Sequence, residues 1–209
     1  MAGPGVDFWQ QRFEAGQTPW DRGASNPQLA AWLDSGELAP CRILVPGCGS
    51  GHEVAELAIR GFEVVALDYA PAAVERTRER LAGLGAPAAR ASVVCADALE
   101  WQPDAPFDAI YEQTCLCALY PDHWAEYAQQ LHRWLKPGGR LFALFVQTLR
   151  PGAAEGFIQG PPYHCDIHGM RALFPGGRWD WPKPPYPRVE HPSGMAELAV
   201  VLGRRALAA

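Results

Sequence analysis

RILVPGCGSGHEVAEL, residues 42–57, joins a short apolar run to three closely spaced glycines. The run ends at Pro46, and glycines then occupy every second position: Gly47, Gly49 and Gly51. The run reads as a buried strand and Glu53–Ile59 as a helix, which places the glycines in the turn between them. Because glycine has no Cβ, its backbone can turn tightly and approach a ligand closely. The stretch therefore predicts a strand, a ligand-binding turn and a helix.

The rest of the chain repeats this alternation of apolar strands and helices. Strands are predicted at 43–46, 63–68, 91–97, 107–112 and 196–205, with a turn that leads into a further strand over 137–146. Helices are predicted at 27–33, 53–59, 71–84 and 123–135. Strands that are apolar along most of their length and alternate with helices are typical of a parallel sheet covered on both faces. We expect a doubly wound α/β fold.

Length and composition narrow the class of protein. The chain has 209 residues, of which 48% are hydrophobic and 20% charged, and its formal net charge is -5. We expect one soluble domain over 1–209, with an aromatic segment at 1–35 and a loop elaboration at 150–194. The negative charge and the absence of a basic block argue against nucleic acid or a membrane surface as partner and favour a small molecule. Without a heptad or a long apolar stripe, a monomer is expected.

Targeting and cysteine patterns predict a cytosolic protein. The N-terminus has neither a basic region nor an apolar core, and the longest apolar runs are too short to span a bilayer. Six cysteines form no CxxC pair, so no disulfide framework is expected. The segment HCDIH, 164–168, has metal-ligating residue types but no second cluster at zinc spacing. It reads as a loop or helix start, and no metal is expected.

The ligand of the glycine turn is predicted from its spacing and from two later carboxylates. A dinucleotide fingerprint needs its third glycine one place later, where this chain has His52, and the helix opens with Glu53, which would repel a diphosphate. Asp68 ends the second strand, where a carboxylate can accept hydrogen bonds from ribose hydroxyls. Asp97 ends the third, where it can accept from an adenine amino group. Together they suggest an adenosine site, although each aspartate could instead cap a helix.

Several motifs resemble one family. The segments are FWQQRFEAGQTPW, VPGCGSG, FDAIYEQTCLCALYP, LKPGG and GPPYHCDIHGMRALF, within residues 8–175. They resemble class I S-adenosylmethionine-dependent methyltransferases of the thiopurine methyltransferase family, which includes plant thiol and halide methyltransferases. The resemblance implies a seven-stranded, Rossmann-like sheet with six parallel strands and one antiparallel strand at 196–205. It also implies S-adenosylmethionine as the cofactor and S-adenosylhomocysteine as the product. Residues 176–194 match no motif of the family.

The same resemblance assigns the cofactor residues. The glycines Gly47, Gly49 and Gly51 would line the cofactor, Asp68 would bind the ribose, and Asp97 with Ala98 the adenine. An aromatic lid would cover the sulfonium, whose positive charge is attracted by aromatic faces. That lid could instead be an N-terminal helix that is merely pinned to the core. The full set of expected cofactor contacts is Trp9, Phe13, Trp20, Gly47, Gly49, Gly51, Asp68, Tyr69, Asp97, Ala98, Glu112 and Gln113.

The acceptor side is expected after the fourth and fifth strands. The substrate contacts would be Trp20, Cys117, Tyr120, Tyr163 and His164, with Glu112, Tyr120 and His164 as candidates for positioning or for a base. His164 could equally be structural. Some relatives carry an arginine at position 113 or 124, so thiopurine recognition does not carry over simply. Cys115 and Cys117 would share one face of a strand end, as buried hydrophobic side chains rather than a redox pair.

The predicted chemistry is an in-line methyl transfer. It requires a water-free site that holds the nucleophile behind the methyl group. A thiol, bisulfide, halide or thiopurine needs no dedicated base, so a soft nucleophile is the first expectation. N- or O-methylation of a small heteroaromatic metabolite is the alternative, and would more often need a base. A nucleotide-dependent oxidoreductase and a non-catalytic cofactor-binding module remain as further alternatives.

Overall fold

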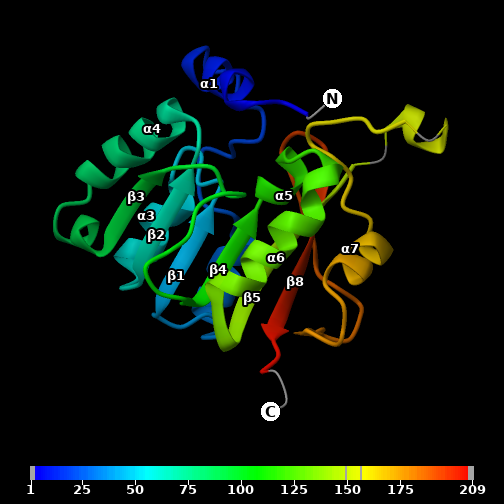
Figure 1. Ribbon diagram of the computed structural model, residues 1–209. Coiled ribbons are helices and arrows are strands. Elements are labelled where there is room, and N and C mark those ends of the chain that lie inside the picture. The colour runs from blue at the N-terminus through cyan, green and yellow to red at the C-terminus, as the bar shows by residue number, and fades with distance from the viewer. Residues whose placement is uncertain (1–2, 149, 156, 207–209) are drawn as a thin grey trace.

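The computed structural model describes residues 3–148, 150–155 and 157–206, which form one mixed sheet flanked by helices (Figure 1). The strand order is β3-β2-β1-β4-β5-β8-β6, with β7 paired to β8. The strands are β1 Arg42–Pro46, β2 Glu63–Asp68, β3 Ala91–Cys95, β4 Phe107–Gln113, β5 Leu135–Gln147, β6 Trp179–Asp180, β7 Arg188–Glu190 and β8 Ala196–Arg204. The α-helices are α1 Val6–Glu14, α2 Pro27–Asp34, α3 His52–Ile59, α4 Pro71–Ala82, α5 Cys115–Ala118, α6 Trp124–Trp134 and α7 Ile167–Leu173.

The predicted mostly parallel sheet with an antiparallel C-terminal strand is confirmed. Strands β1 to β5 pair in parallel, and β8 pairs antiparallel with β5 from Arg140↔Gly203 to Gln147↔Ala196. Both β6 and β7 are antiparallel to β8, so they run in the same direction as β5. The expected sixth parallel strand is therefore present as two short pieces, which raises the count from seven strands to eight.

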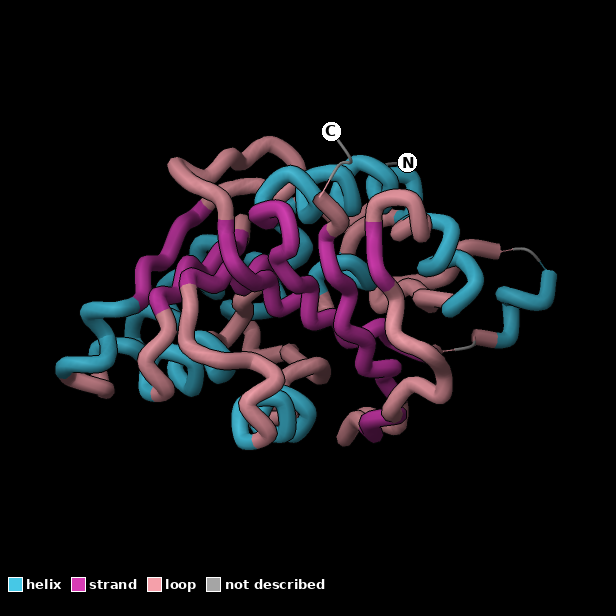
Figure 2. The backbone as a smooth tube through the Cα atoms, turned by 90° about the horizontal axis from the view of Figure 1, so that it is seen from below, coloured by secondary structure: helices cyan, strands magenta, loops and turns pink. Residues whose placement is uncertain are grey.

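Alternate residues of the central strands point to opposite faces of the sheet. On β1, Leu44 joins the core beneath α6 and α7, whereas Ile43 and Val45 join the core beneath α2 and α3. The same alternation places Ile110 of β4 in the first core and Tyr111 in the second. Seen from below, the strands form a middle layer with helices on both sides (Figure 2). This explains why the strands read as continuous apolar runs.

Two predictions at the carboxyl ends of strands are wrong. Strand β3 ends at Cys95, two residues before the expected end at Asp97. After β4, Thr114 adopts a left-handed conformation (φ 64°) and starts the short helix α5. Cys115 and Cys117 therefore lie on a helix, where positions two apart point in different directions, and they do not share the face expected of a strand end.

The segment between β5 and β8 carries two short helices and two short strands. HCDIH proves to be a helix start, because the Asp166 side chain accepts a hydrogen bond from the Gly169 amide (2.9 Å) and caps α7. The 3₁₀ turn Pro151–Glu155 precedes it, and β6 and β7 follow. No described helix is long and apolar enough to cross a membrane.

The glycine turn is set by tight packing against α4. Gly51 has φ 73° and ends the turn as the N-cap of α3. A Cβ at this position would lie 2.8 Å from both Cγ2 and Oγ1 of Thr77, a fully buried residue of α4. Gly61, with φ 91°, has no atom within 4 Å of the corresponding position. The two glycines thus share a left-handed backbone but differ in available space.

This pair yields a stability prediction. Gly61→Ala should lower the free energy of unfolding by about 1 kcal/mol, which is the cost of a left-handed alanine. Gly51→Ala should cost at least about 2 kcal/mol, because the clash with Thr77 adds to that strain. Urea denaturation followed by circular dichroism measures both. Equal losses in the two variants would contradict close packing at Gly51.

Candidate functional site

A cavity of about 620 Å³ opens at the carboxyl ends of the parallel strands. Its floor is the glycine turn between β1 and α3 together with the residues that follow β2, β3 and β4. Helix α1 and the segment up to Ala24 lie on one side, and residues between His191 and Glu197 lie on another. In Figure 1, α1 lies above the arrowheads of these strands. Ligands of open α/β sheets bind at this edge.

The glycine turn presents its backbone to the cavity. Gly47 and Gly49 line it and have φ angles of 62° and 53°. A Cβ on Gly47 would lie 2.9 Å from the Cβ of Cys115, so only glycine fits beneath α5. The Gly49 amide donates to Oδ2 of Asp68 (3.0 Å), and the Gly49 carbonyl accepts from the Thr77 hydroxyl (2.9 Å). Hydrogen bonds therefore hold the turn on both sides of Gly49.

Both predicted aspartates line the cavity, and both also serve the local backbone. Asp68 accepts from Gly49 through Oδ2 and from the Ala70 amide through Oδ1 (3.0 Å each). Burial raises the pKa of Asp68, although these backbone hydrogen bonds act against the rise. Asp97 accepts from the Leu99 amide (2.8 Å) and so caps a turn. The capping and ligand-binding interpretations are compatible, because each carboxylate oxygen can accept a second hydrogen bond.

The aromatic N-terminal segment lies over the cavity. Trp20 makes edge-to-face contacts with Trp9 and with Phe13, with ring centroids 5.3 and 5.7 Å apart. All three line the cavity, and Phe13 also packs on Ala70 and Ala73 at the start of α4. The segment is thus pinned to the core and also forms a cavity wall, so pinning does not exclude the expected role as a lid.

Asp21 joins this segment to the glycine turn. Its carboxylate accepts from the Ser50 hydroxyl (2.5 Å) and from the Gly23 amide (2.7 Å), and it pairs with Nε2 of His52 (2.9 Å). Burial alone would raise the pKa of Asp21, but these hydrogen bonds and the neighbouring His52 together lower it. Asp21, Ser50 and His52 all line the cavity. Asp21 and Ser50 were not predicted as site residues, because polar residues in turns carry no distinctive sequence pattern.

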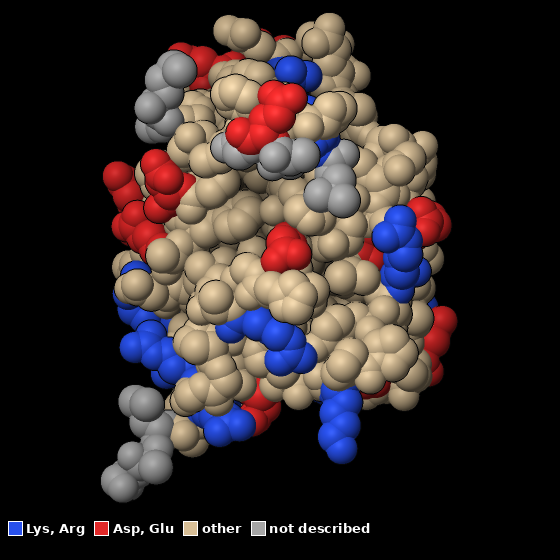
Figure 3. Space-filling view, turned by 90° about the vertical axis from the view of Figure 1, so that its right-hand side faces the viewer, with Lys and Arg blue, Asp and Glu red and all other residues tan. Residues whose placement is uncertain are grey.

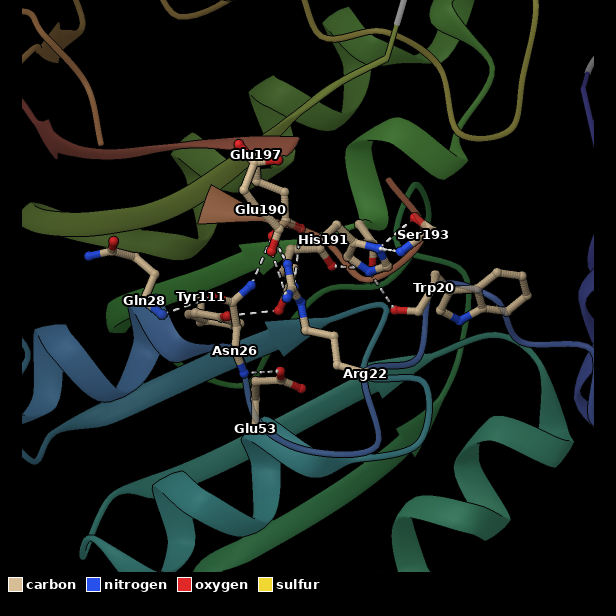
Figure 4. Close-up of polar contacts among 12 residues, drawn as sticks. Trp20, Arg22, Asn26, Gln28, Glu53, Tyr111, Glu190, His191, Ser193 and Glu197 are labelled. Atoms are coloured by element: carbon tan, nitrogen blue, oxygen red, sulfur yellow. Dashed lines mark hydrogen bonds and ion pairs between the residues drawn. The ribbon is translucent and has the colours of Figure 1, made fainter. Parts of the chain in front are cut away.

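A buried polar cluster centred on Glu197 forms the opposite wall (Figure 4). Glu197 of β8 is 1% exposed and accepts hydrogen bonds from the Arg22 guanidinium (2.9 Å), the Asn26 side chain (2.8 Å) and the Gln113 side chain (3.2 Å). The Tyr111 hydroxyl donates to Gln113 in turn (2.8 Å). Sequence reasoning missed the cluster. The available signal was a lone glutamate within the apolar strand AELAVV, which requires a buried partner.

Most of the predicted site residues come together in this cavity. Those that line it are Trp9, Phe13, Trp20, Gly47, Gly49, Asp68, Tyr69, Asp97, Ala98, Gln113 and Cys117. Five others do not line it: Gly51, Glu112, Tyr120, Tyr163 and His164.

Each of these five has another position in the fold. Gly51 lies beneath the turn against Thr77. Tyr120 packs edge-to-face on Tyr163, with ring centroids 5.7 Å apart. Nδ1 of His164 accepts from the Thr148 amide (3.0 Å), which occupies that nitrogen with backbone. Of the GPPY loop, the stretch 160–162 reaches the cavity instead.

Glu112 faces away from the cavity into the core. It is 2% exposed, and its Oε1 accepts from the Leu116 amide (2.7 Å) at the start of α5. Burial raises the pKa of Glu112 to about 7. Burial also raises the pKa of the Cys115 and Cys117 thiols well above the ordinary value, so both stay protonated at neutral pH and are poor nucleophiles.

The raised pKa of Glu112 predicts how stability depends on pH. In the unfolded chain the carboxyl ionises near its ordinary value of 4.5, and in the folded protein near 7. Between these values the folded state binds more protons, so its stability relative to Glu112→Gln should fall as pH rises from 5 to 8, by on the order of 3 kcal/mol. Urea denaturation at the two pH values measures this difference. Glu75→Gln, at an exposed position of α4, is the control and should show no such change.

Comparisons with known proteins agree with this geometry. The chain is 38% identical over 161 residues to a probable thiol methyltransferase 2 of Arabidopsis thaliana, covering 76% of this chain and 67% of that protein. It is 29% identical over 178 residues to a thiopurine S-methyltransferase of Legionella pneumophila, covering 76% of each. Its fold matches a 1,6-didemethyltoxoflavin-N1-methyltransferase of Burkholderia thailandensis, solved with S-adenosylhomocysteine, with a TM-score of 0.75 at 19% identity over 96% of this chain and 87% of that one.

A family model decides the assignment. The model that describes thiopurine S-methyltransferase matches residues 5–183, from the start of the aromatic segment to beyond α7. This span contains the glycine turn, both aspartates and the GPPY loop. The chain therefore belongs to the thiopurine S-methyltransferase family, whose methyltransferases use S-adenosylmethionine.

Proposed function

We propose that this chain transfers the methyl group of S-adenosylmethionine to a small thiol or another soft nucleophile, such as bisulfide, a halide or a thiopurine. One observation carries the proposal: a single cavity brings together the glycine turn, Asp68, Asp97 and the aromatic segment. Thiol and thiocyanate methyltransferases of Arabidopsis thaliana, at 38% and 33% identity, support this acceptor class. We propose that the chain acts as one cytosolic, monomeric unit.

The proposal gives each part of the cavity a role. Asp68 accepts hydrogen bonds from the ribose hydroxyls beside Tyr69, while Asp97 and Ala98 meet the adenine edge. The glycine turn approaches the methionine portion of the cofactor through backbone atoms. Trp9, Phe13 and Trp20 cover the sulfonium, exclude water and stabilise its positive charge through their ring faces. The cofactor supplies an activated methyl group, and the protein supplies alignment.

A soft nucleophile fits the proton chemistry of the cavity wall. His191 contacts the Trp20 carbonyl through Nε2 (3.1 Å) and the Ser193 hydroxyl through Nδ1 (2.6 Å), and His52 pairs with Asp21. Both histidines that line the cavity are thus engaged by the protein. Since Glu112, Tyr120 and His164 lie outside the lining, we assign none of them a direct role in proton transfer. A nucleophile that is already ionised requires none.

The surface and the cavity together favour a small acceptor. On the face shown in Figure 3, both acidic and basic side chains are present, and uncharged surface separates the basic groups, so they form no continuous basic surface there. Nucleic acid binding relies on such basic surfaces. The cavity lining includes aromatic side chains such as Phe8 and apolar prolines such as Pro161 and Pro162 beside its polar groups. Such walls suit a weakly hydrated substrate.

A turnover assay tests the function. Purified protein with S-adenosylmethionine would be given thiols, bisulfide, iodide, thiopurines, aromatic amines and azaheterocycles, and release of S-adenosylhomocysteine would be measured. We expect turnover with a sulfur or halide acceptor. Turnover only with a nitrogen acceptor would replace the acceptor class and keep the cofactor. Binding of S-adenosylhomocysteine without any turnover would contradict the proposed activity.

The ribose role of Asp68 yields a separate prediction. Asp68→Ala removes an acceptor of the ribose and a clamp on Gly49, so the Kd for S-adenosylhomocysteine should rise at least fivefold, equivalent to about 1 kcal/mol. Isothermal titration calorimetry measures the change. Asp104→Ala is the control, because Asp104 is an exposed partner of Arg42 outside the cavity lining. An unchanged Kd in Asp68→Ala would remove Asp68 from the site.

A further inference from the structure

The segment that follows the aromatic lid is held on two sides: by the glycine turn and α3 through Asp21 and Asn26, and by the C-terminal part of the chain. Residues 21–26 contain no helix or strand, so local hydrogen bonding alone does not fix them. Arg22 donates to Oε2 of Glu197 (2.9 Å) and to the Glu190 carbonyl (3.0 Å), which ties this segment to β8 and β7. Next to it, the Trp20 carbonyl contacts Nε2 of His191 (3.1 Å). Figure 4 shows the Arg22 side chain extending from this segment toward Glu197 and Glu190.

Glu197 is the shared partner at the centre of these contacts. Its Oε2 accepts from both Arg22 and Asn26, and its Oε1 accepts from Gln113. Asn26 is fully buried and caps α2 by accepting from the Gln28 amide (2.9 Å). A single carboxylate therefore joins the N-terminal segment, the start of α2 and the end of β4. Arg22, Gln113 and Glu197 also line the cavity, so the cluster forms part of its wall.

Because Arg22 and Glu197 are buried, each charge depends strongly on the presence of the other. The Arg22 and Glu197 side chains are only 9% and 2% exposed, and each charge is neutralised mainly by the other. Removing one partner would leave the other charge buried without compensation, which is far costlier than losing an exposed ion pair. The segment can relieve that cost by moving Arg22 out to water. Trp20 and Asp21, which lie directly before Arg22, would then be held in the cavity wall only by the aromatic contacts of Trp20 and by the contacts of Asp21 to the glycine turn.

We propose that Glu197 is a positioning residue that holds residues 18–26 over the cofactor cavity through Arg22. Glu197 acts from β8, outside the glycine turn and the aromatic segment that bind the cofactor. Its effect on methyl transfer is indirect, through the placement of Trp20 and Asp21. The inference rests on the proposed function only where cofactor binding is the readout.

Hydrogen exchange and cofactor binding test the proposal together. In Glu197→Gln and in Arg22→Gln, amide exchange in residues 18–26 should become at least tenfold faster, while exchange in β1 and β4 stays at the wild-type rate. The Kd for S-adenosylhomocysteine should rise at least tenfold in both variants. Arg22→Lys keeps the charge but not the two-pronged contact, so it should fall between Arg22→Gln and the wild type. If Glu197→Gln does not fold, Arg22→Gln still tests the contact, because Arg22 lies outside the helices and strands.

Glu190, on strand β7 beside β8, offers a matched control. Glu190→Gln breaks the exposed pair between Arg188 and Glu190 (2.8 Å) and leaves the Glu190 carbonyl bound to Arg22. Exchange and affinity should both remain unchanged. Wild-type exchange in residues 18–26 of Arg22→Gln, a uniform rise across the sheet, or an unchanged Kd would each overturn the proposal. Absence of turnover in the wild type would overturn the proposed function instead, and the exchange result would stand.

Discussion

The site depends on the hydrogen bond between the Gly49 amide and the Asp68 carboxylate. This bond joins the turn after β1 to the end of β2 and holds the glycine backbone in its left-handed conformation. The second Asp68 oxygen binds the Ala70 amide, so the same carboxylate also orients the start of α4. Helix α4 in turn presents Thr77 beneath the turn and supports Phe13 above it. One carboxyl group, that of Asp68, thus organises the floor of the cavity and the support of its aromatic wall.

The walls of the cavity come from parts of the chain that are far apart in sequence. The parallel strands supply the floor, the N-terminal segment supplies Trp9 and Trp20, and β8 with its preceding turn supplies Glu197 and His191. Polar contacts hold the N-terminal segment on two sides, and the two sets differ in their exposure to water. Asp21 holds the segment to the glycine turn through partly exposed groups, whereas Arg22 holds it to β8 through groups removed from water. Asp21 and Arg22, which make these contacts, are neighbours in the sequence.

The sequence predicted the elements whose pattern is local. The apolar runs, the glycine turn and the carboxylates near strand ends all follow from short-range spacing, and β2 was placed at its observed bounds. The start of α5 was not predictable, because it depends on a left-handed Thr114 that no propensity favours. Glu112 was assigned to the cofactor from the family resemblance. The pleat of β4, however, turns Tyr111 and Gln113 toward the cavity and Glu112 toward the opposite core. The Glu197 cluster was missed because its partners are up to 175 residues apart.

That sequence separation also determines when the site can be completed during synthesis. Residues 18–26 leave the ribosome early, but Glu197 and His191, which hold them, are translated about 170 residues later. Until then Arg22 lacks the carboxylate that accompanies it out of water in the folded protein. The cavity therefore acquires its final wall only after the last strand has paired with β5. A nascent chain that lacks His191 and Glu197 therefore lacks the contacts that close this wall of the cavity.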